Sequence, residues 1–117
     1  MSDYNRSRLI TAINKFNEGD YFECHEILED IWFDVRDDSR NFYHGLLHIA
    51  VAFYHLTKKN NCKGTLIQLN KAIEKLDGYK EIILGIDVPK LVKQIKRIIL
   101  KLKKKEVPKR LPKINLC

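Results

Sequence analysis

The chain has 117 residues, 44% hydrophobic and 32% charged, which excludes a disordered protein and suffices for one domain with its own core. The net charge of +7 is unevenly distributed: residues 1–57 hold 5 Lys/Arg against 10 Asp/Glu, and residues 58–117 hold 17 against 5. The opening MSDYNRSRL lacks the apolar core of a signal peptide, and no run is long enough to span a bilayer. We therefore expect a soluble protein without a transmembrane segment, in the cytoplasm or, given the abundance of Asn, Ile and Lys, in a plastid stroma.

The three cysteines, Cys24, Cys62 and Cys117, are scattered and form no C-x-x-C pair. An odd set without metal-ligand spacing fits a reducing compartment and argues against both a disulfide framework and a cysteine zinc site. The sequence also contains no phosphate-binding glycine loop and no G-x-S-x-G nucleophile motif.

Apolar residues at helical spacing predict two helices in the acidic half. The first covers about residues 4–17 and is followed by Gly19. Asp20 caps the second helix, which runs to about residue 35, because D-Y-F-E places Glu23 three residues after the cap.

The rest of the sequence predicts three more helices. A long one over about residues 40–59 is apolar on most sides and is expected at the centre. Another covers about residues 65–77, and a last one, opened by Asp87 and Pro89, covers about residues 88–104. The intervening YKEIILGI is compatible with a helix or with a loop packed on the core.

These elements predict an all-α fold: a single compact bundle of about five helices with a basic extended C-terminal tail. Residues 1–105 form the helical domain, and residues 106–117 a flexible tail that is free of the bundle. Pro108 and Pro112 motivate this boundary, because they remove backbone donors and prevent helix formation.

A helical wheel of the second predicted helix places a histidine and a glutamate within an aromatic face, between Phe22 and Trp32. His25 and Glu29 are one turn apart, so their side chains can meet. A buried polar pair needs partners, because leaving it unpaired costs several kcal/mol. We therefore expect both residues to be largely buried and paired.

The third predicted helix carries the other histidines on one face. His44, His48 and His55 fall within about 40° of one another, with Arg40 at the edge, whereas Gly45 and Ala52 form a small-residue strip for a close helix contact. Two helices joined by a short loop are expected to be neighbours. The candidate polar network comprises His25, Glu26, Glu29, Arg40, His44, His48 and His55.

This network has two interpretations. It could fix helix packing, or it could be a metal or acid–base site built from His25, Glu29 and one or two more histidines. The HEILE segment matches a zinc-protease H-E-x-x-H only loosely, and the E-x-x-H motif of di-iron bundles is absent. We therefore favour packing, and we predict no metal, no cofactor and no catalytic residue.

The stretches FNEGDYFECHEILEDIW (residues 16–32), FYHGLLHIAVAFYH (residues 42–55) and a later N-x-x-x-G together resemble the bacterial and plastid family called domain of unknown function 309. The resemblance covers about residues 9–88, and it implies a small all-helical domain and assigns no activity. His48 stands where the family usually has Gln, and a position that accepts Gln is a poor obligatory metal ligand. His25, Glu29 and His55 therefore remain as the candidate metal ligands. Thr65 stands where the family usually has Ala. The matching residues that we expect to serve as a packing signature are Phe16, Gly19, Tyr21, Phe22, Trp32, Gly45 and Ala52.

The last predicted helix combines an apolar stripe with many basic residues. This pattern fits a core helix with a solvated face, and it also fits binding to phosphate groups, an acidic membrane surface or an acidic protein. No aromatic residue follows Tyr79, so stacking on single-stranded bases is not indicated. The candidate polyanion contacts are Lys93, Lys96, Arg97, Lys101, Lys103, Lys104, Lys105, Lys109 and Arg110.

Together these observations favour a structural or protein-interaction module without catalysis, whose protein partner the sequence does not name. Two alternative functions remain compatible with the sequence. One is a basic nucleic-acid-associated protein that uses the C-terminal half, and the other is a metal-dependent enzyme that uses the His/Glu cluster.

Overall fold

The computed structural model describes residues 3–116, which confirm the all-α class. Five helices and one minimal hairpin follow in the order α1 (Asp3–Asn17), α2 (Tyr21–Asp34), α3 (Arg40–Lys58), α4 (Cys62–Leu76), β1 (Ile82–Ile83), β2 (Ile86–Asp87) and α5 (Val88–Lys103). Residues 1, 2 and 117 lie outside the described residues. The prediction that Cys117 belongs to no disulfide framework and no zinc site therefore also concerns a residue outside them.

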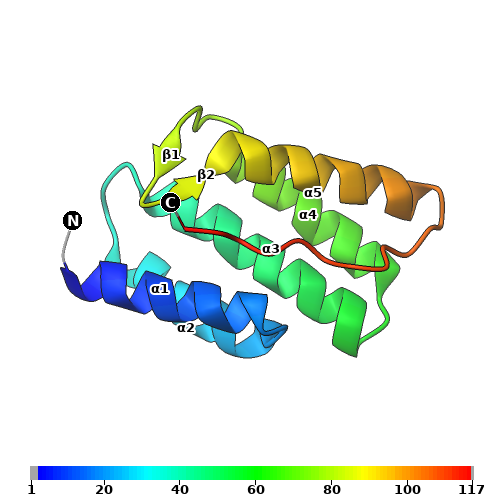
Figure 1. The fold of residues 1–117 in the computed structure, drawn as a ribbon, viewed down its shortest axis with the longest axis horizontal. Coiled ribbons are helices and arrows are strands. Elements are labelled where there is room, and N and C mark those ends of the chain that lie inside the picture. Colours follow the sequence, from blue (N-terminus) through cyan, green and yellow to red (C-terminus); the bar gives the residue numbers. More distant parts are fainter. Residues whose placement is uncertain (1–2, 117) are drawn as a thin grey trace.

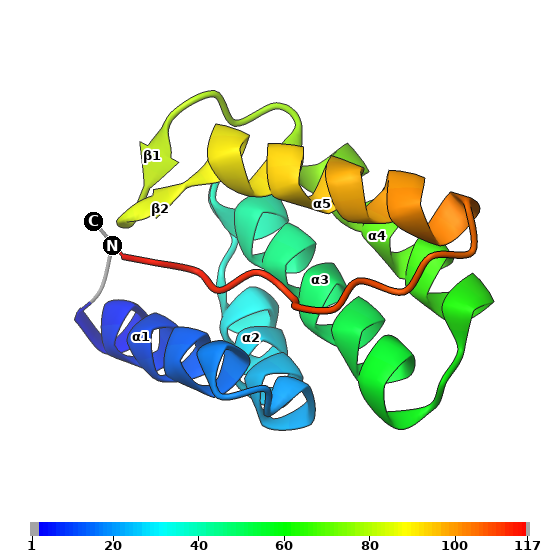
Figure 2. The same cartoon turned by 45° about the vertical axis from the view of Figure 1, so that its right-hand side comes forward.

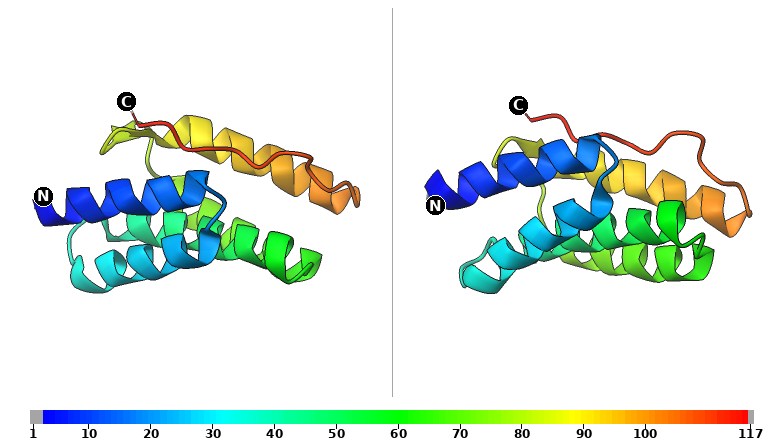
Figure 3. Two further views of the ribbon diagram at one scale, coloured as in Figure 1. Left: turned by 60° about the horizontal axis from the view of Figure 1, so that its bottom comes forward. Right: turned by 90° about the horizontal axis from the view of Figure 1, so that it is seen from below.

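The helices pack as a bundle around α3. This helix contacts both α2 and α4, whereas α1 packs on α2 and α5 packs on α4 (Figure 1). The C-terminal segment turns back after α5 and runs beside it toward the hairpin, and the rotated views of Figure 3 show that it lies in one layer with α1 and α5.

The centre of the core is aromatic. Phe42, Tyr43 and Phe53 of α3 are fully buried, which confirms the predicted central position of this helix. The Phe53 ring lies 5.7 Å from Phe16 and 5.5 Å from Tyr21, centroid to centroid. Such edge and tilted pairs add to the free energy gained from burial, and they join α1, α2 and α3 at one point.

Helix ends follow the predicted local chemistry. The Asp20 side chain accepts a hydrogen bond from the Glu23 N–H at 3.3 Å, and Asp87 accepts one from the Lys90 N–H at 3.1 Å. Gly19 has φ +83° and ends α1 in a Schellman motif, in which the Asp20 N–H donates to the Lys15 carbonyl at 2.9 Å.

Two local features differ from what we expected from the sequence. The fourth helix begins at Cys62, because Asn61 caps it by accepting a hydrogen bond from the Gly64 N–H at 2.9 Å. YKEIILGI is neither a helix nor a plain loop, but contains a two-stranded hairpin in which Ile83 pairs with Ile86. Its turn residues, Leu84 and Gly85, both have positive φ, as a type I′ turn requires.

Gly45 permits the close contact between α3 and α4. A Cβ atom at this position would lie 2.4 Å from Cγ of Leu76, well inside van der Waals distance. Ala52, about two turns further along the helix, is also fully buried. Both residues of the predicted small-residue strip are therefore buried, and at Gly45 the strip meets α4 closely.

The C-terminal segment, residues 106–116, is extended as expected but touches the bundle. Figure 2 shows this segment running back along α5 and across α3 toward the hairpin. Ile114 is only 6% exposed, and Leu111 is partly buried against the core. Asn17 in α1 forms two hydrogen bonds with the backbone of Ile114. These contacts argue against the predicted flexible segment that is free of the bundle.

Candidate functional site

The core-facing side of α2 is rotated from the predicted one. Its buried residues are Tyr21, Cys24, Leu28 and Ile31, whereas Phe22 is 48% exposed. Phe22 and Phe33 lie on a different side of the helix from these buried residues, so aromatic residues by themselves do not mark the stripe that meets α1 and α3. The His25–Glu29 stripe consequently lies along a flank of the bundle.

His25 and Glu29 do meet, but at the surface. Nε2 of His25 lies 3.4 Å from Oε2 of Glu29, and their side chains are 25% and 57% exposed. The prediction of a pair was correct, and the prediction of a buried pair was wrong for Glu29. Glu26 is also exposed, so the acidic groups of this stripe face solvent.

A stacked column links α2, α3 and α4. The guanidinium carbon of Arg40 lies 4.4 Å from the Trp32 ring centroid. The rings of Trp32 and His44 stack with their centroids 4.7 Å apart. His44 in turn lies 4.4 Å from His48, whose Nδ1 is 2.7 Å from Oε1 of Gln68. Arg40 therefore caps an aromatic column instead of joining Glu29 in one polar network.

The column keeps its histidines neutral. Burial, together with the neighbouring His48 and Lys75, lowers the pKa of His44 to about 4. Burial also lowers the pKa of His48, although its hydrogen bond to Gln68 opposes this shift. Neutral imidazoles can stack on each other and on indole without charge repulsion, so the geometry of the column is compatible with the packing role that we expect for it.

The other two histidines line a surface pocket that we call the aromatic pocket. Its walls are Phe22, His25, Val51, Tyr54 and His55, and they enclose about 200 Å³. The Phe22 ring lies 5.5 Å from Tyr54 and 5.8 Å from His25, centroid to centroid. A second hollow, lined by Glu18, Asp20 and Lys58 among others, shares Phe22 and Tyr54 with it.

The four histidines therefore fall into two pairs and do not form one cluster. His44 and His48 belong to the column, and His25 and His55 to the aromatic pocket. Across residues 3–116, no three His, Cys, Asp or Glu side chains are grouped so that they could hold a metal ion.

The remaining signature residues divide between core and turn. Phe16, Tyr21, Gly45 and Ala52 are buried, Trp32 is partly buried in the column, and Gly19 has open space around its Cα. The exposed Phe22 is thus the one apolar member that contributes a surface. Sequence reasoning missed Tyr54 and Val51 as pocket residues, because both read as part of an apolar central helix.

Two cysteines lie within the described part of the chain. Cys24 is fully buried, and burial raises its pKa to about 12, so it is an unreactive thiol at neutral pH. Cys62 is exposed at the start of α4.

The apolar stripe of α5 faces the bundle as predicted. Leu91, Ile95, Ile98 and Leu102 are buried, whereas all nine basic residues named as candidate polyanion contacts are exposed. Lys96 lies 3.7 Å from Asp77, an ion pair between α5 and the end of α4. The exposed charges form the basic side of the molecule.

The fold and the flank just described define a small all-α domain that presents aromatic and histidine side chains between two helices. Residues 9–75, more than half of the chain, match the family model described as domain of unknown function (DUF309), and the chain belongs to this family. Over 82 residues it is 32% identical to the uncharacterized protein YpuF of Bacillus subtilis (strain 168), a match that covers 68% of this chain and 47% of that protein. The chain thus spans about half the length of this curated relative. No helix in the part of the chain that the structure describes is long and apolar enough to cross a membrane.

Proposed function

We propose that this protein is a non-catalytic protein-interaction module that docks a partner through the aromatic pocket between α2 and α3. The observation that carries the proposal is the 48% exposure of Phe22 at the mouth of an apolar hollow of about 200 Å³. A hollow of this size accepts one large apolar side chain, and covering Phe22 would contribute on the order of 1 kcal/mol.

The chemistry around the pocket indicates the partner. Glu26 follows Phe22 by one helical turn, Glu29 pairs with His25, and Glu18 and Asp20 line the adjoining hollow. These carboxylates outnumber the two lysines on the rim, Lys58 and Lys59. The partner segment is therefore an apolar anchor, aromatic or large aliphatic, flanked by Lys or Arg.

A displayed library of random peptides, selected on the intact protein, tests this function. The selected peptides should share an apolar residue next to basic residues, and Phe22→Ala or Tyr54→Ala should weaken their binding at least about tenfold. Phe33→Ala is the matched control, because Phe33 is an exposed aromatic residue of the same helix outside the pocket. Peptides that bind equally well to Phe22→Ala and to the unchanged protein would refute the proposal.

The two alternatives from the sequence have weaker support. A metal-dependent enzyme would need His25, Glu29 and His55 to converge on one ion, and the grouping described above offers no such set among residues 3–116. Nucleic-acid binding is supported only by the exposed charge of α5 and the C-terminal segment, and charge alone does not distinguish phosphate groups from carboxylates.

A further inference from the structure

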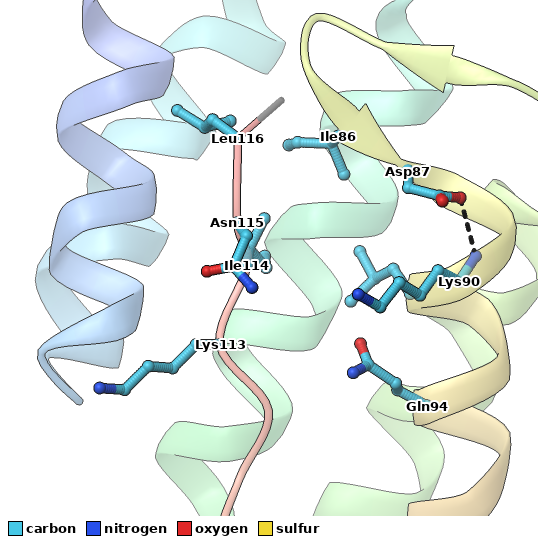
Figure 4. A pocket seen from close by; sticks show the side chains of 9 residues that line it. Ile86, Asp87, Lys90, Gln94, Lys113, Ile114, Asn115 and Leu116 are labelled. Atoms are coloured by element: carbon cyan, nitrogen blue, oxygen red, sulfur yellow. Dashed lines mark hydrogen bonds between the residues drawn. The ribbon is translucent and has the colours of Figure 1, made fainter.

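A groove separates α5 from the returning C-terminal segment. It consists of two adjoining hollows of about 130 and 250 Å³, which share Gln94 at their junction, and we call it the basic groove. Figure 4 shows the first hollow, with Lys90 and Gln94 reaching from α5 toward the segment that carries Ile114. It lies on the basic side of the molecule, away from the residues that line the aromatic pocket.

The groove has an apolar floor and a basic rim. Leu91 and Ile114 contribute to the floor of the first hollow, and Ile98 and Leu111 to that of the second. The rim carries Lys90, Arg97, Lys101 and Arg110. The one acidic residue lining the groove, Asp87, already accepts a hydrogen bond as the cap of α5.

The C-terminal segment also offers backbone groups to the groove. Both backbone groups of Ile114 bond to Asn17 on the α1 side. In an extended chain, neighbouring residues point their N–H and C=O groups to opposite sides, so those of Lys113 and Asn115 point toward α5. No hydrogen bond engages these groups within residues 3–116.

From these three features we infer that the basic groove binds an extended acidic segment of a partner protein that carries apolar side chains. Carboxylates of the partner would meet the basic rim, two of its apolar side chains would enter the hollows, and its backbone would pair with Lys113 and Asn115. From Leu91 to Ile98 the helix rises about 10 Å, the length of about three extended residues, so a short peptide reaches both hollows.

Nucleic acid fits this groove less well. No residue that lines either hollow is aromatic, so single-stranded bases would find no ring to stack on. The apolar floor also offers nothing to a phosphate backbone. The charge of the rim alone does not distinguish the two ligands, and the binding experiment must include both.

The test measures fluorescence anisotropy of a labelled peptide of alternating Glu and Leu residues with the full chain at physiological salt. Arg97→Glu combined with Lys101→Glu should weaken binding at least about tenfold, because both residues line the groove. Lys93→Glu combined with Lys103→Glu changes the net charge equally on exposed α5 residues that do not line the groove, and should weaken binding less than about threefold. A peptide with Lys in place of Glu should not bind.

Two further measurements decide the outcome. On adding the acidic peptide, the NMR signals of the Lys113 and Asn115 amides should shift, and Phe22→Ala should leave the affinity unchanged. Equal losses for the two double variants, or unshifted amides, would overturn the proposal. Tighter binding of a short DNA duplex or of single-stranded oligouridine than of the peptide would overturn it in favour of nucleic acid.

Discussion

Asn17 and Ile114 are separated by 97 residues and exchange two hydrogen bonds of 2.8 Å. The Asn17 amide nitrogen donates to the Ile114 carbonyl, and the Ile114 N–H donates to the Asn17 amide oxygen. The side chain thereby acts as a strand partner, which fixes the path of the C-terminal segment against α1. The same contact directs the neighbouring backbone groups into the basic groove.

Replacing Asn17 with Ala should therefore release this segment. We expect a loss of about 1–3 kcal/mol in the free energy of unfolding, from two hydrogen bonds and part of the burial of Ile114. Urea denaturation measures the loss, and hydrogen exchange should show faster exchange of the Ile114 amide. Asn14→Ala, an exposed position on the same helix, is the control and should change neither. An unprotected Ile114 amide in the unchanged protein would show that the segment is mobile, as the sequence suggested.

Gly45 offers a prediction about the closest helix contact. Gly45→Ala would push a methyl group into the Leu76 side chain, which is fully buried and has little room to move. We expect a loss of about 1–3 kcal/mol in the free energy of unfolding, the usual cost of overpacking a core. Gly78→Ala is the matched control, because a Cβ atom there meets nothing within 4 Å, and its melting temperature should not fall. Equal melting temperatures for the two variants would show that α3 and α4 can separate at little cost.

The features that could be predicted from the sequence are local ones. Asp20 and Asp87 cap their helices through neighbours three residues away, and the apolar stripe of α5 is narrow enough to allow one orientation only. The orientation of α2 was predicted wrongly, because its aromatic residues do not all lie on the side that is buried. Packing against α1 and α3 selected Cys24 and Ile31 for the core and left Phe22 outside. Contacts far apart in sequence, such as Asn17 with Ile114, leave no periodic signal.

The surface position of Glu29 lowers the cost that we expect for its removal. A buried carboxylate would make Glu29→Ala cost about 1–3 kcal/mol. The Glu29 side chain is 57% exposed, and within residues 3–116 it pairs only with His25. We therefore expect Glu29→Ala to lower the free energy of unfolding by less than about 0.5 kcal/mol. Urea denaturation at neutral pH measures the change, and a midpoint shift equivalent to more than 1 kcal/mol would require a buried role for this residue that its exposure does not indicate.

The stacked column predicts how stability depends on pH. In the folded protein burial holds the pKa of His44 at about 4, below the value of about 6.5 for a free imidazole. Between these values the unfolded chain binds a proton that the folded chain does not, so this residue's contribution is complete above pH 6.5 and is lost as the pH falls toward 4. Solvent screens the partly exposed ring, so we expect this loss of stability to be about 1 kcal/mol.

The variant His44→Phe isolates this effect. It keeps an aromatic ring against Trp32 but has no imidazole to titrate, and the carboxylates titrate alike in both proteins. The difference between their urea midpoints, measured from pH 7 to pH 4.5, should therefore change steadily in favour of the variant. A constant difference over this range would mean that His44 binds its proton as readily in the folded chain as in the unfolded one, and that the column does not keep it neutral.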